Sequence, residues 1–148
     1  MIRTQKRLRL CAALIIVNLC FIWGNSLLPG EISGAISDFV KDVVRAIFAF
    51  LGFPPGGGGG GGLLRKIAHF TEFACLGGLC TWLFGMLQRS ALLALGSGFL
   101  AACIDETIQC FVPNRGPSVF DVGIDTAGVA VGIAVLLFIY FIRKRKKS

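Results

Sequence analysis

Four apolar runs, each about 20 residues long, dominate this chain of 148 residues. They cover residues 8–28, 67–87, 91–112 and 122–142. A helix needs about 20 apolar residues to cross the hydrocarbon core of a bilayer. Inside lipid the backbone must satisfy its own hydrogen bonds, which favours helices over other structures. The sequence therefore predicts an all-α, polytopic membrane helix bundle with four transmembrane helices in one domain, residues 1–148.

The distribution of positive charge predicts how the bundle is oriented. Nine of the fifteen lysines and arginines flank the first and last runs: Arg3, Lys6, Arg7, Arg9, Arg143, Lys144, Arg145, Lys146 and Lys147. Basic residues beside a span mark its cytoplasmic side. We therefore expect a multi-pass protein of the cell membrane with both termini in the cytoplasm. The bilayer is then its partner, and nucleic-acid binding is disfavoured. Arg65 and Lys66 fall on the opposite side, against the rule, but the two tails outweigh them.

The first run also has the basic start and apolar centre of a signal peptide. Its exit, residues 23–26, reads Trp-Gly-Asn-Ser and shows no small-residue cleavage pattern. Because the cleavage site is a required part of a signal peptide, we expect an uncleaved helix.

The outer loop, residues 29–66, contains a further predicted helix. Apolar residues recur there near helical spacing: Ile32, Ile36, Phe39, Val40, Val43, Ile47 and Leu51. The opposite face carries Asp38, Lys41, Asp42 and Arg45. This pattern predicts an amphipathic helix that lies on the membrane surface or caps the bundle, ended by residues 52–55. The glycine run 56–62 is interpreted as a flexible linker.

The six cysteines carry no metal-binding or disulfide pattern. None forms a Cys-x-x-Cys pair, and all lie in or beside apolar runs: Cys11, Cys20, Cys75, Cys80, Cys103 and Cys110. We interpret them as small buried hydrophobic residues and assign no metal site to the sequence. The sequence does not identify a cofactor.

Polar and ionisable residues inside the spans are the strongest functional signal. They occupy the outer ends of the last three runs and the turn between two of them: His69, Glu72, Asp105, Glu106, Gln109, Arg115, Asp121 and Asp125. Such residues are costly in a membrane and are functional candidates by default. Asp121 is also explained as a helix cap, and His69 as a packing residue. The adjacent pair Asp105–Glu106 has no such explanation.

Charge counting raises a further question about this outer layer. Five carboxyl groups (Glu72, Asp105, Glu106, Asp121 and Asp125) face three cations (Arg65, Lys66 and Arg115) and the titratable His69. We expect Arg115 to be the ion-pair partner of Asp105–Glu106. The remaining negative charge must be met by a bound cation, a protonated carboxyl or a cationic group of a ligand.

Small residues predict close helix packing rather than chemistry. Gly128 and Gly132 form a small-xxx-small stripe, and the segments 77–78 and 96–98 contain similar residues. Such residues let membrane helices approach closely.

Several of these motifs together resemble a known family. The segment 65–73, Arg-Lys-Ile-Ala-His-Phe-Thr-Glu-Phe, and the segment 105–115, Asp-Glu-Thr-Ile-Gln-Cys-Phe-Val-Pro-Asn-Arg, are similar to VanZ-like membrane proteins. So are Asp121-Val122, the segment 125–128 and the first-run exit 25–30. Order and spacing agree over nearly the whole chain, and the glycine linker is the one departure.

The resemblance implies a bacterial cell-envelope protein, in a family whose naming member is associated with teicoplanin resistance. One interpretation is a non-enzymatic protein that binds an envelope lipid or lipoglycopeptide through a polar network: Lys66, His69, Glu72, Asp105, Glu106, Gln109, Arg115, Asp121 and Asp125. The other is a membrane-embedded acid/base enzyme acting on a lipid-linked substrate, with catalytic candidates His69, Glu72, Asp105 and Glu106. An ion pathway is disfavoured because the polar residues stay in the outer half.

Overall fold

The computed structural model describes residues 2–50 and 61–146 of the chain. Five helices make up the described part, which contains no strand: α1 (Ile2–Ser26), α2 (Gly30–Phe50), α3 (Gly61–Met86), α4 (Ala91–Gln109) and α5 (Val119–Arg145). Four of them, all but α2, are long and apolar enough to cross a membrane. The predicted all-α bundle of four transmembrane helices and one amphipathic helix is confirmed.

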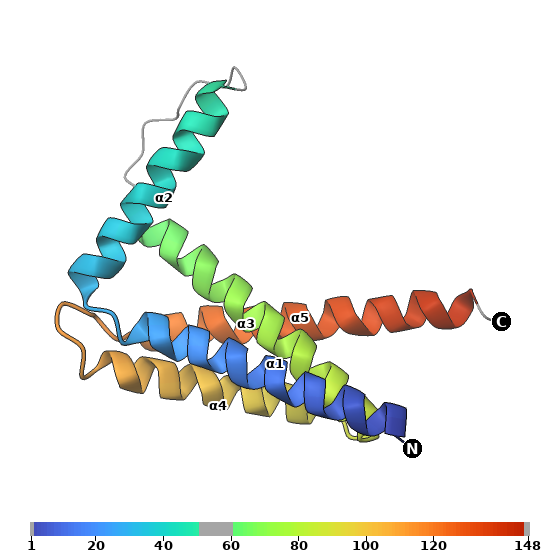
Figure 1. The fold of residues 1–148 in the computed structure, drawn as a ribbon. Coiled ribbons are helices and arrows are strands. Elements are labelled where there is room, and N and C mark those ends of the chain that lie inside the picture. The colour runs from blue at the N-terminus through green and yellow to red at the C-terminus, as the bar shows by residue number, and fades with distance from the viewer. Residues whose placement is uncertain (1, 51–60, 147–148) are drawn as a thin grey trace.

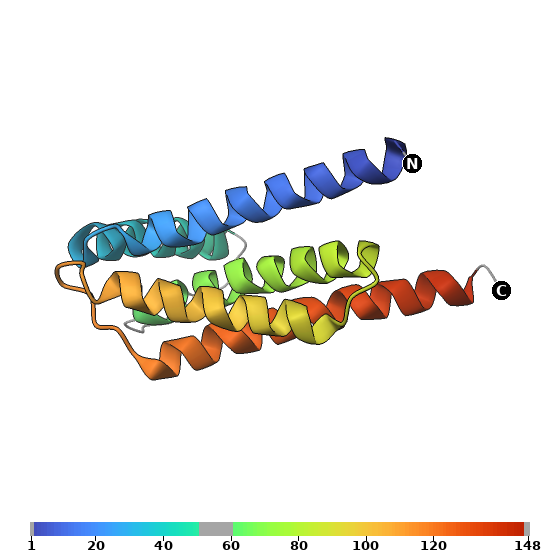
Figure 2. The ribbon, with the colours of Figure 1, turned by 90° about the horizontal axis from the view of Figure 1, so that it is seen from below.

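The four long helices run side by side, with both termini at one end of the bundle (Figures 1 and 2). We call this the terminal end. The opposite end, which carries the connections 27–29 and 110–118, is the distal end (Figure 1). Helix α3 packs against every other helix and makes its most extensive contact with α5. The residues that begin α3, end α4 and begin α5 therefore all lie near the distal end.

The ends of several helices differ from the ends of the predicted apolar spans. Helices α1 and α5 continue into the basic tails, because long basic side chains can leave the apolar layer while the backbone stays helical. Helix α4 ends at Gln109 rather than at residue 112, and residues 110–112 form turns. Helix α3 begins at Gly61, so the last two predicted linker glycines are helical. The rest of the linker, residues 56–60, lies outside the described residues.

Small residues allow the central helices to touch. A Cβ atom on Gly128 would lie 2.5 Å from the carbonyl oxygen of Phe70, and a Cβ on Gly77 or Gly132 would also meet backbone of the facing helix. The stripe Gly128–Gly132 therefore packs α5 against α3 as predicted. Gly96 does not contribute, because nothing lies within 4 Å of a Cβ placed there.

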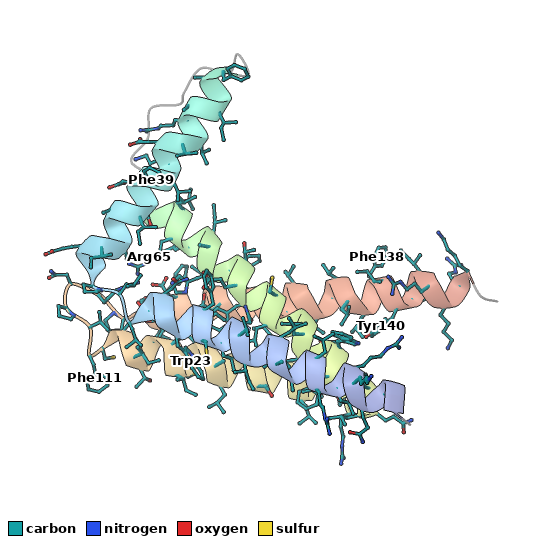
Figure 3. The ribbon with its side chains drawn as sticks, viewed as in Figure 1. Trp23, Phe39, Arg65, Phe111, Phe138 and Tyr140 are labelled. Atoms are coloured by element: carbon teal, nitrogen blue, oxygen red, sulfur yellow. The ribbon has the colours of Figure 1, made fainter. Side chains whose placement is uncertain are left out.

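The bundle core is small, and apolar side chains cover the outside. Phe73, Ile22 and Val129 are fully buried, whereas Phe138 on α5 points away from the bundle (Figure 3). Such an outer surface suits contact with lipid. Among the cysteines only Cys11 and Cys80 are buried. The prediction that all six are buried was wrong, because apolar runs in a membrane have outward faces too.

Helix α2 leaves the bundle at the distal end, at a steep angle to the other helices (Figures 1 and 2). Its start is fixed by the Gly30 N–H, which donates to the Pro113 carbonyl at 3.1 Å. Two residues of its apolar face, Ile36 and Val40, lie towards α3, while Phe39 is 70% exposed (Figure 3). The predicted end of α2, at Leu51 and residues 52–55, lies outside the described residues.

Candidate functional site

Polar side chains from three helices meet near the distal end of the bundle. Asp105 on α4 is fully buried, Asp125 on α5 is 2% exposed, and the His69 side chain on α3 is 12% exposed. His69 Nδ1 lies 3.7 Å from Asp105 Oδ2. These three residues, which we call the buried triad, each offer a ligand-type atom within 4.8 Å of the other two.

Gln109 organises the carboxylates of α4. Its Nε2 amino group donates to Asp105 Oδ2 at 2.9 Å and lies 3.3 Å from both Glu106 Oε1 and Ser26 Oγ. An amide NH₂ has two hydrogens, so it serves two of these three acceptors at a time. The predicted polar edge of Asp105, Glu106 and Gln109 is thus assembled on one side of α4. Ser26 was not among the predicted site residues, and its only signal is its place in the first-run exit motif, residues 25–30.

Glu106 connects α4 to the start of α5. Its Oε2 accepts a hydrogen bond from the Ser118 N–H at 2.8 Å, and Ser118 is the N-cap residue of α5. A charged acceptor at a helix N-terminus is favourable because the first N–H groups have no partner within the helix. Glu106 therefore positions α5, and Ser118 rather than Asp121 caps that helix.

Replacing Glu106 should separate its hydrogen-bonding role from its charge. We expect Glu106→Ala to lower the free energy of unfolding by about 2 kcal/mol, because a charge-assisted bond to backbone is lost. Glu106→Gln should lose less than half of that, since its amide oxygen can still accept from Ser118. Thermal unfolding in detergent measures both variants, and equal losses would contradict this role.

Arg115 does not form the predicted ion pair. Its Nε donates to the Leu28 carbonyl at 3.0 Å and its Nη2 donates to the Asn25 carbonyl at 2.6 Å. Among residues 2–50 and 61–146, Arg115 forms no ion pair with a carboxylate. The physical reason is that carbonyls at and just beyond a helix C-terminus lack α-helical N–H partners. The guanidinium fork satisfies two of them at once, Asn25 in the last turn of α1 and Leu28 in the connection that follows. Burial, with a smaller effect from Arg65, lowers the pKa of the Arg115 guanidinium, which still remains charged.

Lys66 and Asp121 form a separate, more exposed ion pair. Their Nζ and Oδ1 atoms are 2.8 Å apart, and the Lys66 side chain is 44% exposed. The same ammonium lies 5.4 Å from the centre of the Phe120 ring. Exposed pairs of this kind contribute little to stability. The pair joins α3 to α5 at the edge of the group of polar side chains near the distal end.

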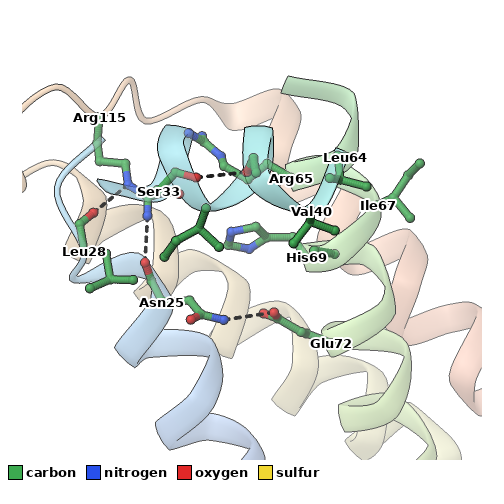
Figure 4. Close-up of a pocket in the computed structure, with 13 residues that line it drawn as sticks. Asn25, Leu28, Ser33, Val40, Leu64, Arg65, Ile67, His69, Glu72 and Arg115 are labelled. Atoms are coloured by element: carbon green, nitrogen blue, oxygen red, sulfur yellow. Dashed lines mark hydrogen bonds between the residues drawn. The ribbon is translucent and has the colours of Figure 1, made fainter. Parts of the chain in front are cut away.

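A cavity of about 260 Å³ opens between α2, α3 and the end of α1 (Figure 4). Its polar side is formed by Asn25, His69, Glu72 and Arg115, and Asn25 Nδ2 donates to Glu72 Oε1 at 3.0 Å. Its apolar side is formed by residues from two helices and one connection: Leu28, Ile36, Val40, Leu64, Ile67 and Ala68. We call this space the amphipathic cavity. His69 lines it and also belongs to the buried triad.

The structure thus gathers most of the predicted site residues, but in two adjoining places. One place is the buried triad of His69, Asp105 and Asp125, beside which lie Glu106 and Gln109. The other is the amphipathic cavity, which is faced by His69, Glu72 and Arg115. The Lys66–Asp121 pair lies at the margin. Sequence reasoning missed Asn25, whose only signal was its place in the first-run exit motif.

Together, the helices and the buried polar layer define a polytopic membrane bundle with an ionisable site at one end. The chain belongs to the VanZ/LLP1 family, whose model matches residues 10–141. This match confirms the resemblance drawn from the motifs at residues 65–73 and 105–115. No match was found among curated proteins or among solved structures.

Proposed function

We propose that this protein is a bacterial cell-envelope membrane protein that binds an amphiphilic molecule in the amphipathic cavity. The observation that carries the proposal is the two-sided lining of that cavity. Asn25, Glu72 and Arg115 offer hydrogen-bonding and charged groups, and Leu64 and Ile67 offer apolar surface, within one space of about 260 Å³ (Figure 4). A few placed polar groups in an otherwise apolar concave site are typical of ligand pockets.

The position of α2 supports an amphiphile as the ligand. This helix extends from the distal end at a steep angle to the other helices (Figure 1), with Ser33, Ile36 and Val40 on one side of the cavity. An amphipathic helix of this kind rests at the boundary of headgroups and acyl chains. A lipid or lipoglycopeptide bound there would place its polar part against His69 and Glu72 and its apolar part between α2 and α3.

We place the distal end on the outer face of the membrane, with both termini in the cytoplasm, because of the basic tails. Cys110 tests this orientation, since it is exposed just after α4. We expect a membrane-impermeant maleimide to label intact cells that carry the wild type but not those that carry Cys110→Ser. Labelling of Cys110 only after the cells are opened would reverse the proposed topology.

The family resemblance makes teicoplanin resistance the physiological role to test. We expect a sensitive host that expresses the wild type to tolerate more teicoplanin than the vector control. Ala68→Phe, which places a ring in the cavity, should remove this protection. Ala13→Phe, at an exposed site on α1, should keep it at matched membrane levels. Absence of protection by a well-expressed wild type would contradict the resistance role.

A membrane-embedded acid/base enzyme is the second candidate function. The observation that favours it is the position of His69, which faces the cavity and lies 3.7 Å from the Asp105 carboxylate. A histidine oriented by a carboxylate can transfer protons to a bound substrate. Glu106 is a poorer candidate base, because its carboxylate already accepts from Ser118 and Gln109. An enzyme predicts that His69→Asn retains lipid binding and loses turnover of a lipid-linked substrate.

A further inference from the structure

We propose that His69, Asp105 and Asp125 bind one divalent transition-metal ion, Zn²⁺ or Mn²⁺. Their ligand atoms come from α3, α4 and α5 and lie within 4.8 Å of one another. Ligands bound to one zinc ion are about 3–4 Å apart, given bond lengths near 2 Å. The 3.7 Å separation of His69 Nδ1 and Asp105 Oδ2 already fits, and a small rotation of the Asp125 side chain completes the set.

Asp125 independently supports a bound cation, because its carboxylate lacks a polar partner among the described residues. It is 2% exposed, and its buried Oδ2 atom has no hydrogen-bond partner. Its side chain makes neither a hydrogen bond nor an ion pair with any part of the chain that the structure describes. Asp105 Oδ1 is also buried without a hydrogen-bond partner. A buried carboxylate without a partner is costly, and a cation bound between the two would remove that cost.

The nearby basic side chains do not neutralise these carboxylates. Lys66 pairs with Asp121 at 2.8 Å, and Arg115 is hydrogen-bonded to the carbonyls of Asn25 and Leu28. Arg65 lines a small cavity beside His69 and Asp125, yet it forms no ion pair within residues 2–50 and 61–146. That cavity, about 10 Å³, is close to the space that one water molecule occupies. This cavity is therefore large enough for about one ion or one water molecule.

The donor set selects the class of ion. One imidazole nitrogen and two carboxylates suit Zn²⁺, and the carboxylates also suit Mn²⁺. Two negative charges match one divalent cation. Gln109 donates to Asp105 Oδ2 at 2.9 Å, and such a bond orients a ligating carboxylate. Three protein ligands leave a coordination position open for water. This inference does not depend on what occupies the amphipathic cavity.

The test measures binding of Zn²⁺ alone to the full chain in detergent, after chelation, by equilibrium dialysis with elemental analysis. We expect about one ion per wild-type chain and at least about 100-fold weaker binding by Asp125→Asn, since loss of even an outer-shell contact costs 10–100-fold. Asp38→Asn makes the same charge change on exposed α2 and should bind as the wild type does. Mn²⁺ is tested in the same way.

Thermal unfolding shows whether Asp125→Asn loses metal binding or loses its fold. Without metal, Asp125→Asn should unfold at or above the wild-type temperature, because the carboxylate it replaces has no partner. Zn²⁺ at 100 times its Kd should raise the wild-type midpoint by about 5–10 °C and leave Asp125→Asn unchanged. The proposal is overturned if neither ion binds the wild type, or if Asp125→Asn binds as tightly.

Discussion

Gly132→Ala should lower the free energy of unfolding by about 3 kcal/mol, near the upper range for overpacked cores. A Cβ at Gly132 would meet the Ala74 carbonyl oxygen and would lie 2.8 Å from the Ala74 carbonyl carbon and 2.9 Å from the Gly78 nitrogen. All three are backbone atoms of α3, so the clash cannot be relieved by a side-chain rotation. Helices α3 and α5 must separate, and their contact is the most extensive in the bundle.

Gly123→Ala is the matched control on the same helix. Nothing lies within 4 Å of a Cβ placed at Gly123, so we expect a change within about 1 kcal/mol, in the stabilising direction because alanine restricts the unfolded chain. Thermal unfolding in detergent, followed by the loss of monodisperse protein, should show a midpoint about 10 °C lower for Gly132→Ala alone. Equal midpoints for the two variants would contradict the close packing of α3 on α5.

Arg115→Ala should have an effect of similar size, a loss of about 3 kcal/mol in the free energy of unfolding. Arg115 is 9% exposed, and its guanidinium donates to the carbonyls of Leu28 and Asn25. Hydrogen bonds that involve a charged group contribute about 1.5–3 kcal/mol each, and removal of the side chain leaves both carbonyls without this donor. The end of α1 and the connection 110–118 would then lose the two hydrogen bonds that Arg115 makes between them.

Two further variants separate geometry from charge at this position. Arg115→Lys keeps the positive charge but replaces the planar fork by a single ammonium, so we expect it to recover about half of the loss. Arg89→Ala removes an exposed arginine from the turn at the terminal end and should change stability by less than about 0.5 kcal/mol. Full recovery by lysine would show that charge, rather than the two directed bonds, is what Arg115 supplies.

The fold could be predicted because the membrane imposes strong constraints on sequence. Four apolar runs of sufficient length predict four helices, and the structure contains them. The ends could not be predicted as well, since Gln109 ends α4 through turn geometry that hydropathy does not register. The stripe Gly128–Gly132 was identified correctly, but Gly96 was not, because spacing alone does not say which face of α4 meets a neighbour.

The polar layer could be predicted in part for a similar reason. Ionisable groups in apolar runs are conspicuous, so His69, Asp105 and Asp125 were all identified from sequence. The partners of Arg115 could not be predicted, because they are backbone carbonyls and carry no sequence signal. The amphipathic cavity also could not, since it depends on the direction in which α2 leaves the bundle (Figure 1).

Lipid occupancy of the amphipathic cavity tests the central claim most directly. Native mass spectrometry of protein purified from bacterial membranes in mild detergent would compare the wild type, Ala68→Phe and Ala13→Phe. We expect a retained amphiphile on the wild type and on Ala13→Phe, and its loss from Ala68→Phe, because Ala68 lines the cavity and Ala13 does not. Retention of the same molecule by folded Ala68→Phe, or its absence from the wild type, would contradict the proposed binding site.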